Sequence, residues 1–313
     1  MELNFVRTPR FYVWLAISLL AVLVVALAGS AHGQIAMRTM VAHDDDSGAT
    51  QSVHDQETIR KSFTLPAGER LLDIDNVTGF IEVTGSSSDQ VQVVVNKTIR
   101  AESKDKLEKA RKEVSLDVTQ EGGSLKLYVN GPFRCNCCCN DGCSHSDHDT
   151  GYSVRTDFQV QVPQNIALKL RTVNGGHVQV KDVTGNYTVR NVNGGIEMEN
   201  VAGSGSARTV NGGVKVVFRE NPRENSEFAS INGSIDLYFA RNLSADFRFK
   251  TMNGGVFTDF PMTSLPAHAT QPERRDGRFM FRSDRFTGGR VGSGGPEIKA
   301  ENLNGSIRVL ERQ

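Results

Sequence analysis

Residues Leu168–Phe218 read LKLRTVNGGHVQVKDVTGNYTVRNVNGGIEMENVAGSGSARTVNGGVKVVF, and this stretch decides the fold. The phrase Val-Asn-Gly-Gly occurs in it at Val173–Gly176, Val192–Gly195 and Val210–Gly213. Weaker copies follow at Ile231–Ser234, Met252–Gly255 and Leu303–Ser306. The asparagines of the first five units recur at a nearly constant interval, which is the regularity of an internal repeat.

Each repeat contains two short segments in which apolar and polar residues alternate, such as His177–Val180 and Ile196–Glu199. This alternation has the period of a β-strand. The glycines supply turns, because glycine adopts positive φ at no steric cost, and Asn before Gly is a strong turn signal. Half-copies at Val183–Gly185 and Val201–Gly203 lie between the strong copies, so a turn is expected about twice per repeat.

Two short strands and two turns per period predict a β-solenoid-like stack whose rungs each span about 20 residues. An antiparallel β-sandwich with Asn-Gly hairpins is the alternative. In a solenoid, equivalent residues of successive rungs lie about 4.8 Å apart. We therefore expect the repeat valines to form an internal apolar column. We also expect a ladder of stacked side-chain amides from Asn174, Asn193, Asn211, Asn232, Asn253 and Asn304.

The composition agrees with an all-β domain, since the chain has 30 glycines and few helix-forming stretches. Ser103–Glu113 is the one convincing helix, with Leu107 and Ala110 facing inward, and it is expected to cap the sheet. Lys and Arg together number 36, as do Asp and Glu, so the formal net charge is zero. This balance gives no indication of a nucleic-acid partner.

The N-terminal segment, residues 1–33, has the features of a targeting sequence. Arg7 and Arg10 precede an apolar run over residues 11–28, which fits a cleaved export signal or an uncleaved membrane anchor. Both alternatives place the rest of the chain outside the cytoplasm: in the periplasm, on the outer surface, secreted, or tethered to the inner membrane by residues 11–28. Residues 34–57 have the composition of a disordered linker, and residues 58–313 are expected to form the β-repeat domain.

A loop over residues 131–150 carries all five cysteines, followed by two histidines. In an exported chain, disulfides are the default for such a cluster. A zinc or copper site is the rival, because thiolate and imidazole ligands occur at short spacing, although the spacing matches no standard zinc motif. A redox role is a third alternative. The residues concerned are Cys135, Cys137, Cys138, Cys139, Cys143, His145 and His148.

An insert over residues 261–295 breaks the repeat and is rich in arginine and phenylalanine. These side chains could contact an anionic glycan or a membrane surface. The alternative is an edge loop whose arginines pair with Glu273, Asp276 and Asp284. The surface-contact residues predicted here are Arg274, Arg275, Arg278 and Arg282.

Enzymatic motifs are absent from the sequence, which lacks G-x-S-x-G, H-E-x-x-H, P-loop and EF-hand patterns. A β-helix carbohydrate-active enzyme would need clustered acids on one face. The repeat acids Asp182, Glu197, Glu199 and Asp236 instead occupy scattered outward positions. We therefore expect neither a catalytic residue nor a resident cofactor.

The run Asp75–Val83, followed by Val-Asn-Gly-Gly-Ile-Glu-Met units, resembles bacterial adhesin-like β-strand repeat domains of the DUF4097 group. The resemblance covers about Thr58 to Arg312. It implies a right-handed β-solenoid-like fold in an envelope or secreted protein, and it brings no catalytic residues.

Together these features predict an exported, non-enzymatic β-repeat protein that acts as a binding, adhesion or scaffold module of the cell envelope. Its partner would be an envelope protein or a polysaccharide, and any membrane contact would come from the N-terminal segment. A metal- or redox-responsive protein acting through the Cys/His loop is one alternative, and a β-helix carbohydrate-active enzyme is another.

Overall fold

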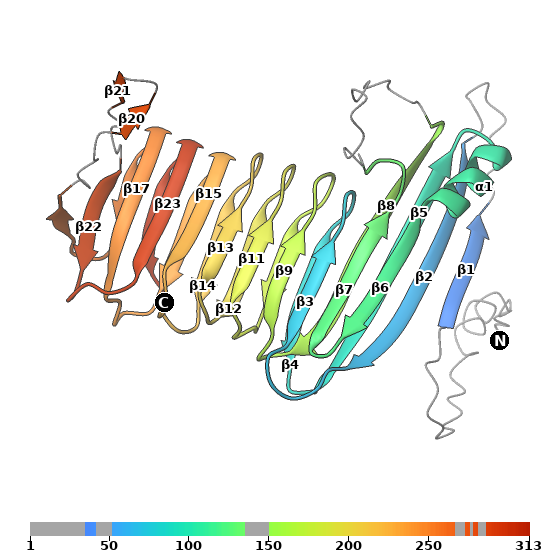
Figure 1. Cartoon of the computed structure of the whole chain (residues 1–313), viewed down its shortest axis with the longest axis horizontal. Coiled ribbons are helices and arrows are strands. Elements are labelled where there is room, and N and C mark those ends of the chain that lie inside the picture. Colours follow the sequence, from blue (N-terminus) through green and yellow to red (C-terminus); the bar gives the residue numbers. More distant parts are fainter. Residues whose placement is uncertain (1–34, 42–51, 135–149, 267–272, 276–277, 281–285) are drawn as a thin grey trace, which may run out of the picture. The chain divides into compact units, whose positions relative to one another are not determined.

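The computed structural model describes residues 35–41, 52–134, 150–266, 273–275, 278–280 and 286–313. All of them belong to one unit, Gln34–Gln313, which consists of two large β-sheets and one helix, α1 (Lys104–Glu113) (Figure 1). A small hairpin joins β20 (Glu273–Arg275) to β21 (Arg278–Met280). Within the described residues no helix is long and apolar enough to cross a membrane.

Sheet A contains strands from both ends of this unit. In spatial order they are β1 (Ile35–Val41), β2 (Val53–Thr64), β5 (Gln90–Ala101), β8 (Tyr152–Pro163), β4 (Ile81–Ser86), β10 (Val178–Lys181), β12 (Ile196–Val201), β14 (Val214–Phe218), β16 (Ile235–Phe239), β24 (Ile307–Glu311) and β18 (Val256–Thr258). Neighbours from β8 to β18 are parallel, and those from β1 to β8 are antiparallel.

Sheet B contains the other strands of this unit apart from the β20–β21 hairpin, and they alternate with those of sheet A from β8 to β18. In spatial order they are β19 (Thr263–Leu265), β22 (Thr287–Val291), β17 (Ala245–Asn253), β23 (Glu297–Asn304), β15 (Ser226–Asn232), β13 (Gly205–Arg208), β11 (Tyr187–Arg190), β9 (Ala167–Arg171), β3 (Leu71–Asp75), β7 (Ser124–Asn130) and β6 (Ser115–Glu121). Neighbours from β17 to β7 are parallel.

The all-β prediction is confirmed, and both alternative architectures describe part of it. From β9 to β18 the chain passes back and forth between the sheets, and each strand pairs in parallel with its counterpart in a neighbouring rung, as in a solenoid. The two sheets enclose one apolar core, as in a sandwich. Phe218 and Phe239 of sheet A stack at 4.9 Å and meet Phe228 and Phe247 of sheet B edge-on. The handedness of the coil stays a prediction.

The expected helix is present, and its two inward residues are buried. Ser103 caps its N-terminus by accepting a hydrogen bond from the Lys106 amide. Leu107 and Ala110 pack on Ile99 and Ala101 of β5. Helix α1 therefore covers part of the inward-facing side of sheet A.

The expected linker over residues 34–57 is wrong in part, because strands occupy much of it. β1 pairs with β2, and β2 pairs with β5 from Val53 onward. The polar composition of this stretch misled the prediction. Asp55 is only 4% exposed, and its carboxylate pairs with Arg111 of α1 at 2.8 Å, so this charged residue belongs to the folded unit.

The final repeat unit does not follow the chain order. β23 lies between β15 and β17, and β24 lies between β16 and β18. The C-terminal rung is thus inserted between two earlier rungs, where both of its strands gain a hydrogen-bonded neighbour on each side. The C-terminal rung therefore does not lie at the end of the stack.

The six repeat asparagines form one file of side-chain hydrogen bonds along the turn edge, which we call the ladder edge. Neighbouring side chains bond from Nδ2 to Oδ1 at 2.7–2.8 Å. The order follows the rungs in space, so Asn304 stands between Asn232 and Asn253. The side chains in spatial order are Asn174, Asn193, Asn211, Asn232, Asn304 and Asn253.

A second polar file lies just inside the first. The residue two positions before each ladder asparagine is a small polar residue that donates to a glycine carbonyl in the turn of the neighbouring rung. Thr209, for example, donates to the Gly194 carbonyl at 2.8 Å, and Ser230 donates to the Gly212 carbonyl at 2.9 Å. The same contact is made by Thr172, Asn191, Asn302 and Thr251. These bonds satisfy carbonyls that the turns would otherwise leave unpaired.

The valines of the strong copies are not in the core, contrary to expectation. Val173, Val192 and Val210 are half-buried and lie outside the buried cluster, whereas Val183 and Val201 of the half-copies are buried. Strand parity explains the difference. Leu168, Leu170 and Thr172 point inward, so Val173 belongs to the outward set. The equivalent Ile231, Leu303 and Met252 are 42%, 37% and 62% exposed.

Glycine is required at the ladder edge mainly because the turns stack so closely. A Cβ on Gly194 would lie 2.0 Å from the Gly176 carbonyl oxygen, and one on Gly254 would lie 2.0 Å from the Gly305 oxygen. Neither glycine has positive φ. The expected reason, freedom to adopt positive φ, applies at Gly175 (φ 71°) but not at these two positions.

Replacing Asn193 by Ala tests the outer ladder. The change removes the bonds to Asn174 and from Asn211, both at the exposed surface. We expect the free energy of unfolding to fall by about 1–2 kcal/mol in urea titrations followed by circular dichroism. Gln92→Ala serves as control, because Gln92 is exposed on β5 and is not part of the ladder. A loss in Asn193→Ala no larger than in this control would contradict a stabilising role for the ladder.

Replacing Thr209 by Val tests the inner file. Valine keeps the shape of threonine but leaves the Gly194 carbonyl without its donor in a buried site, so we expect a loss of about 1–3 kcal/mol in the same titration. Wild-type stability in Thr209→Val would show that the carbonyl needs no partner.

Replacing Gly194 by Ala tests the close approach of the turns. The clash with the Gly176 oxygen should lower the free energy of unfolding by about 3 kcal/mol or more. Gly195 in the same turn is the matched control, because its Cβ would meet the nearest atom at 3.4 Å and its φ is not positive. Equal effects of Gly194→Ala and Gly195→Ala would refute the steric explanation.

Candidate functional site

The three strong repeat copies share one residue that the turn does not need. They read Arg-Thr-Val-Asn-Gly-Gly, Arg-Asn-Val-Asn-Gly-Gly and Arg-Thr-Val-Asn-Gly-Gly, beginning at Arg171, Arg190 and Arg208. The remaining units have Asp75, Ala229, Lys250 and Glu301 at the equivalent position. The fold therefore accepts an acid, a small residue or a base there, and the arginines call for a reason other than folding.

The strand register brings the three arginines side by side on the outer face of sheet B. Arg190 is paired with Arg171 of β9 on one side and with Arg208 of β13 on the other. All three are exposed, and strands pair at about 4.8 Å. We call these three residues the arginine row. It lies one strand position before the inner polar file, so the ladder edge fixes its register.

Only the two outer members of the row have carboxylate partners among the described residues. The Arg171 guanidinium lies 3.5 Å from the Asp75 carboxylate, and the Arg208 guanidinium pairs with Glu227. Within the same described part of the chain, Arg190 makes no ion pair. Positive charge is therefore least compensated at the middle of the row.

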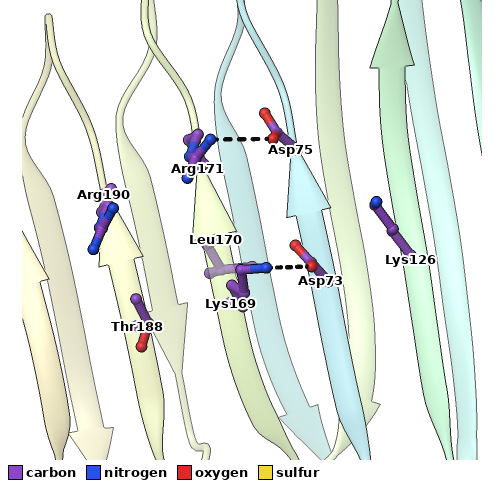
Figure 2. Close-up of a pocket in the computed structure, with 8 residues that line it drawn as sticks. All are labelled: Asp73, Asp75, Lys126, Lys169, Leu170, Arg171, Thr188 and Arg190. Carbon is purple, nitrogen blue, oxygen red and sulfur yellow. Dashed lines mark hydrogen bonds and ion pairs between the residues drawn. The ribbon is translucent and has the colours of Figure 1, made fainter.

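A shallow hollow of about 170 Å³ lies beside the arginine row, across β7, β3, β9 and β11. Figure 2 shows Arg171 directed toward Asp75 and Lys169 toward Asp73, with Thr188 and Arg190 on the next strand. The Lys169 ammonium binds Asp73 at 2.8 Å. The hollow is lined by Asp73, Asp75, Lys126, Lys169, Leu170, Arg171, Thr188 and Arg190.

Arg134 ties the beginning of the cysteine-rich loop to this surface. Its guanidinium donates to the Asp75 carboxylate and to the Asp75 carbonyl, both at 2.8 Å, and it lies 4.2 Å above the Tyr128 ring. Asp75 thus binds two arginines, Arg134 and Arg171. The predicted site residues of the loop lie outside the described residues: Cys135, Cys137, Cys138, Cys139, Cys143, His145 and His148.

No group of three or more His, Cys, Asp or Glu side chains that could hold a metal occurs among the residues the structure describes. This finding does not test the zinc or copper site predicted for the loop, because the cysteines and histidines concerned lie outside the described residues.

The predicted contact arginines of the insert are brought together only in part. Arg274 and Arg275 lie on β20, and Arg278 pairs with Arg275 across the hairpin from β21. Arg282 lies outside the described residues. Their role in surface contact stays a prediction.

The outward acids of sheet A are bound to cations or amides. Glu197 accepts from the Lys215 ammonium at 2.7 Å, and this hydrogen bond lowers the pKa of Glu197 and raises that of Lys215. Glu199 lies 3.3 Å from Lys181, Asp236 binds Arg308, and Asp182 accepts from Asn200. An acid whose pKa is lowered stays ionised and is poorly suited to donate a proton at neutral pH.

The sequence contained signals for the arginine row and for the inner polar file, neither of which was predicted from it. The arginines of the row recur at the same interval as the asparagines of the strong copies, but the repeat was defined from its valine onward. The inner polar file occupies the position between arginine and valine. Defining the unit two positions earlier would have revealed both.

No protein-family model matches the chain, and no curated protein matches it. Similar solved structures include a candidate cell adhesion protein from Clostridium sporogenes, with 10% identity over 81% of this chain and 99% of that chain and a TM-score of 0.38. A candidate lipid binding protein from Parabacteroides distasonis has 12% identity over 80% and 96%, with a TM-score of 0.28. A candidate adhesin from Bacteroides fragilis has 9% identity over 82% and 97%, with a TM-score of 0.24. Proteins named as candidate adhesins are thus among the structures the chain is similar to, but likenesses of this size leave the function to be argued from its own residues.

Proposed function

We propose that the chain is an exported, non-enzymatic binding module of the cell envelope, and that its external partner contacts the outer face of sheet B. One observation carries the proposal: the arginine row repeats a charged residue in neighbouring strands at a position where other units carry Asp, Ala, Lys or Glu. Like charges side by side on a sheet are destabilising. A partner that supplies negative charge explains why they stand there.

The sequence supports the location. The basic start and the apolar run over residues 11–28 would direct the chain to the export machinery or hold it in the inner membrane. Cleavage would release the repeat domain to the periplasm, the outer surface or the medium. Either outcome presents the arginine row to envelope material.

A rigid surface suits a binding role. The face of sheet B is laid out by parallel strands whose register is fixed at the ladder edge. Its side chains pair across strands, as in Lys169 with Asp73. Backbone positions on regular strands keep their spacing, so a ligand needs to order only the side chains that it binds.

The test is co-sedimentation of the purified full-length chain with washed cell-envelope fragments in a buffer of low salt. We expect the wild-type chain to pellet with the fragments and the Arg190→Glu/Arg208→Glu double variant to stay mostly in the supernatant. Binding should weaken as salt is raised, because exposed charges are screened.

Arg100→Glu is the control, since it makes the same charge reversal as each of the two substitutions, at an exposed position on β5 of sheet A. It should pellet like the wild type. Equal retention of all variants would place the contact elsewhere, and no retention of any of them would refute the envelope-binding function. Release of soluble fragments from the envelope during incubation would show an enzyme instead.

A further inference from the structure

The spacing and exposure of the arginine row point to a ligand class, which deepens the function proposed above and rests on it. We propose that Arg171, Arg190 and Arg208 bind a linear acidic polysaccharide that lies across the strands, with one acidic group at each arginine. The ligand chain would run at right angles to β9, β11 and β13.

The periodicity of the arginine row fits such a chain. The row repeats one guanidinium per strand, at about 4.8 Å. This repeat is close to the rise of one sugar in an extended polysaccharide, so consecutive acidic sugars can meet consecutive arginines. Guanidinium groups bind carboxylate and sulfate groups through paired, charge-assisted hydrogen bonds.

The charges of the arginine row are unevenly neutralised. Asp75 and Glu227 flank Arg171 and Arg208, while Arg190 stands between two like charges. An acidic group bound at Arg190 would relieve this repulsion. Thr188, two residues earlier on β11 and in the lining of the hollow, offers a hydroxyl that can bond to a sugar.

The shape of the site also favours a polymer. The hollow is about 170 Å³, whereas pockets that enclose a small ligand usually measure roughly 300–1,000 Å³. A compact ligand would therefore stay largely exposed. A polymer instead gains affinity from contacts at successive arginines along its length. Beyond Arg208, the next strand, β15, carries the small side chain of Ala229 at the paired position, so no bulky side chain stands in the path of the polymer there.

Single-stranded nucleic acid is disfavoured by the same residues. Such ligands are held by aromatic side chains on which bases stack. The arginine row and the hollow contribute arginine, lysine, aspartate, threonine and leucine, and the aromatic ring beside them, Tyr128 of β7, is covered by the Arg134 guanidinium at 4.2 Å.

The experiment is titration calorimetry of the full-length chain with polygalacturonate and with galacturonate oligomers of one to five sugars. Dextran, oligo-dT and phosphatidylglycerol vesicles serve as comparison ligands. We expect polygalacturonate to bind and dextran not to bind. Affinity should rise steeply from one sugar to three, because three arginines form the row.

Arg190→Gln and Arg190→Glu should weaken polygalacturonate binding roughly tenfold or more, since each removes a charge-assisted hydrogen bond. Arg100→Glu should stay within about twofold of wild type, since exposed charges far from the site are screened. Unfolding curves of each variant check that the fold is kept. Arg190→Gln alone decides the result if Arg190→Glu fails to fold.

The outcomes separate this proposal from the broader one. Unchanged polygalacturonate binding in Arg190→Gln would overturn the site. Tighter Arg190-dependent binding of oligo-dT or vesicles than of polygalacturonate would overturn the ligand class, while loss of envelope binding in Arg190→Glu/Arg208→Glu would still support the proposed function. Failure of the wild-type chain to bind envelope fragments would remove both.

Discussion

The structure depends on one contact repeated from rung to rung: a small polar side chain donates a hydrogen bond to a glycine carbonyl in the turn of the neighbouring rung. Thr172 and Gly79, Thr209 and Gly194, and Thr251 and Gly305 are three instances. The contact exists only when the turns lie directly over one another. That distance excludes a Cβ on the turn glycine, and it also lets the exposed asparagines bond in a file. One constraint, the parallel stacking of turns, therefore explains the small polar side chain, the turn glycine and the ladder asparagine.

The same constraint organises the face of sheet B. Because the turns stack in register, the residues that precede them in neighbouring strands are also in register. Arginines that recur three positions before the ladder asparagine therefore lie side by side as a row. The two interruptions of the repeat leave the stack at different edges. Residues 131–150 follow β7 at the end where other rungs have an Asn-Gly turn. The insert over residues 261–295 instead follows the end of β18 and precedes the start of β23, at the strand ends away from the ladder edge.

The sequence was sufficient for the fold class, for the rung length and for the membership of the ladder, because these follow from periodicity and from turn chemistry. It was insufficient for the position of the last rung. Asn232, Asn253 and Asn304 have equivalent turns, and local chemistry cannot say which pair stacks. The valines were assigned to the wrong side because strand parity was not followed through Thr172 into the turn. β1 was missed because residues 34–57 were treated as one polar segment, although Ile35–Val41 itself reads IAMRTMV.

For the candidate site, the sequence drew attention to the two interruptions and passed over the repeat itself. Once turns and stacking accounted for asparagine and glycine, the unit looked fully explained by folding. Arg171, Arg190 and Arg208 are not explained in this way, and only the register shows that they are neighbours. Their number and spacing can be read from the sequence, but their partners cannot, since Asp75 and Glu227 come from other units of the chain.

The stacking account is tested most directly by hydrogen–deuterium exchange of the full-length chain, read by peptide mass spectrometry over β23 and β24. Both strands lie between hydrogen-bonded neighbours, whereas β18 forms an edge of sheet A. The account predicts that amides in Glu297–Glu311 exchange as slowly as those in β15 and β16, and much more slowly than those in β18. Exchange of Glu297–Glu311 as fast as that of β18 would show that the last rung is not inserted, and would contradict the stacking order of the ladder at Asn232, Asn304 and Asn253.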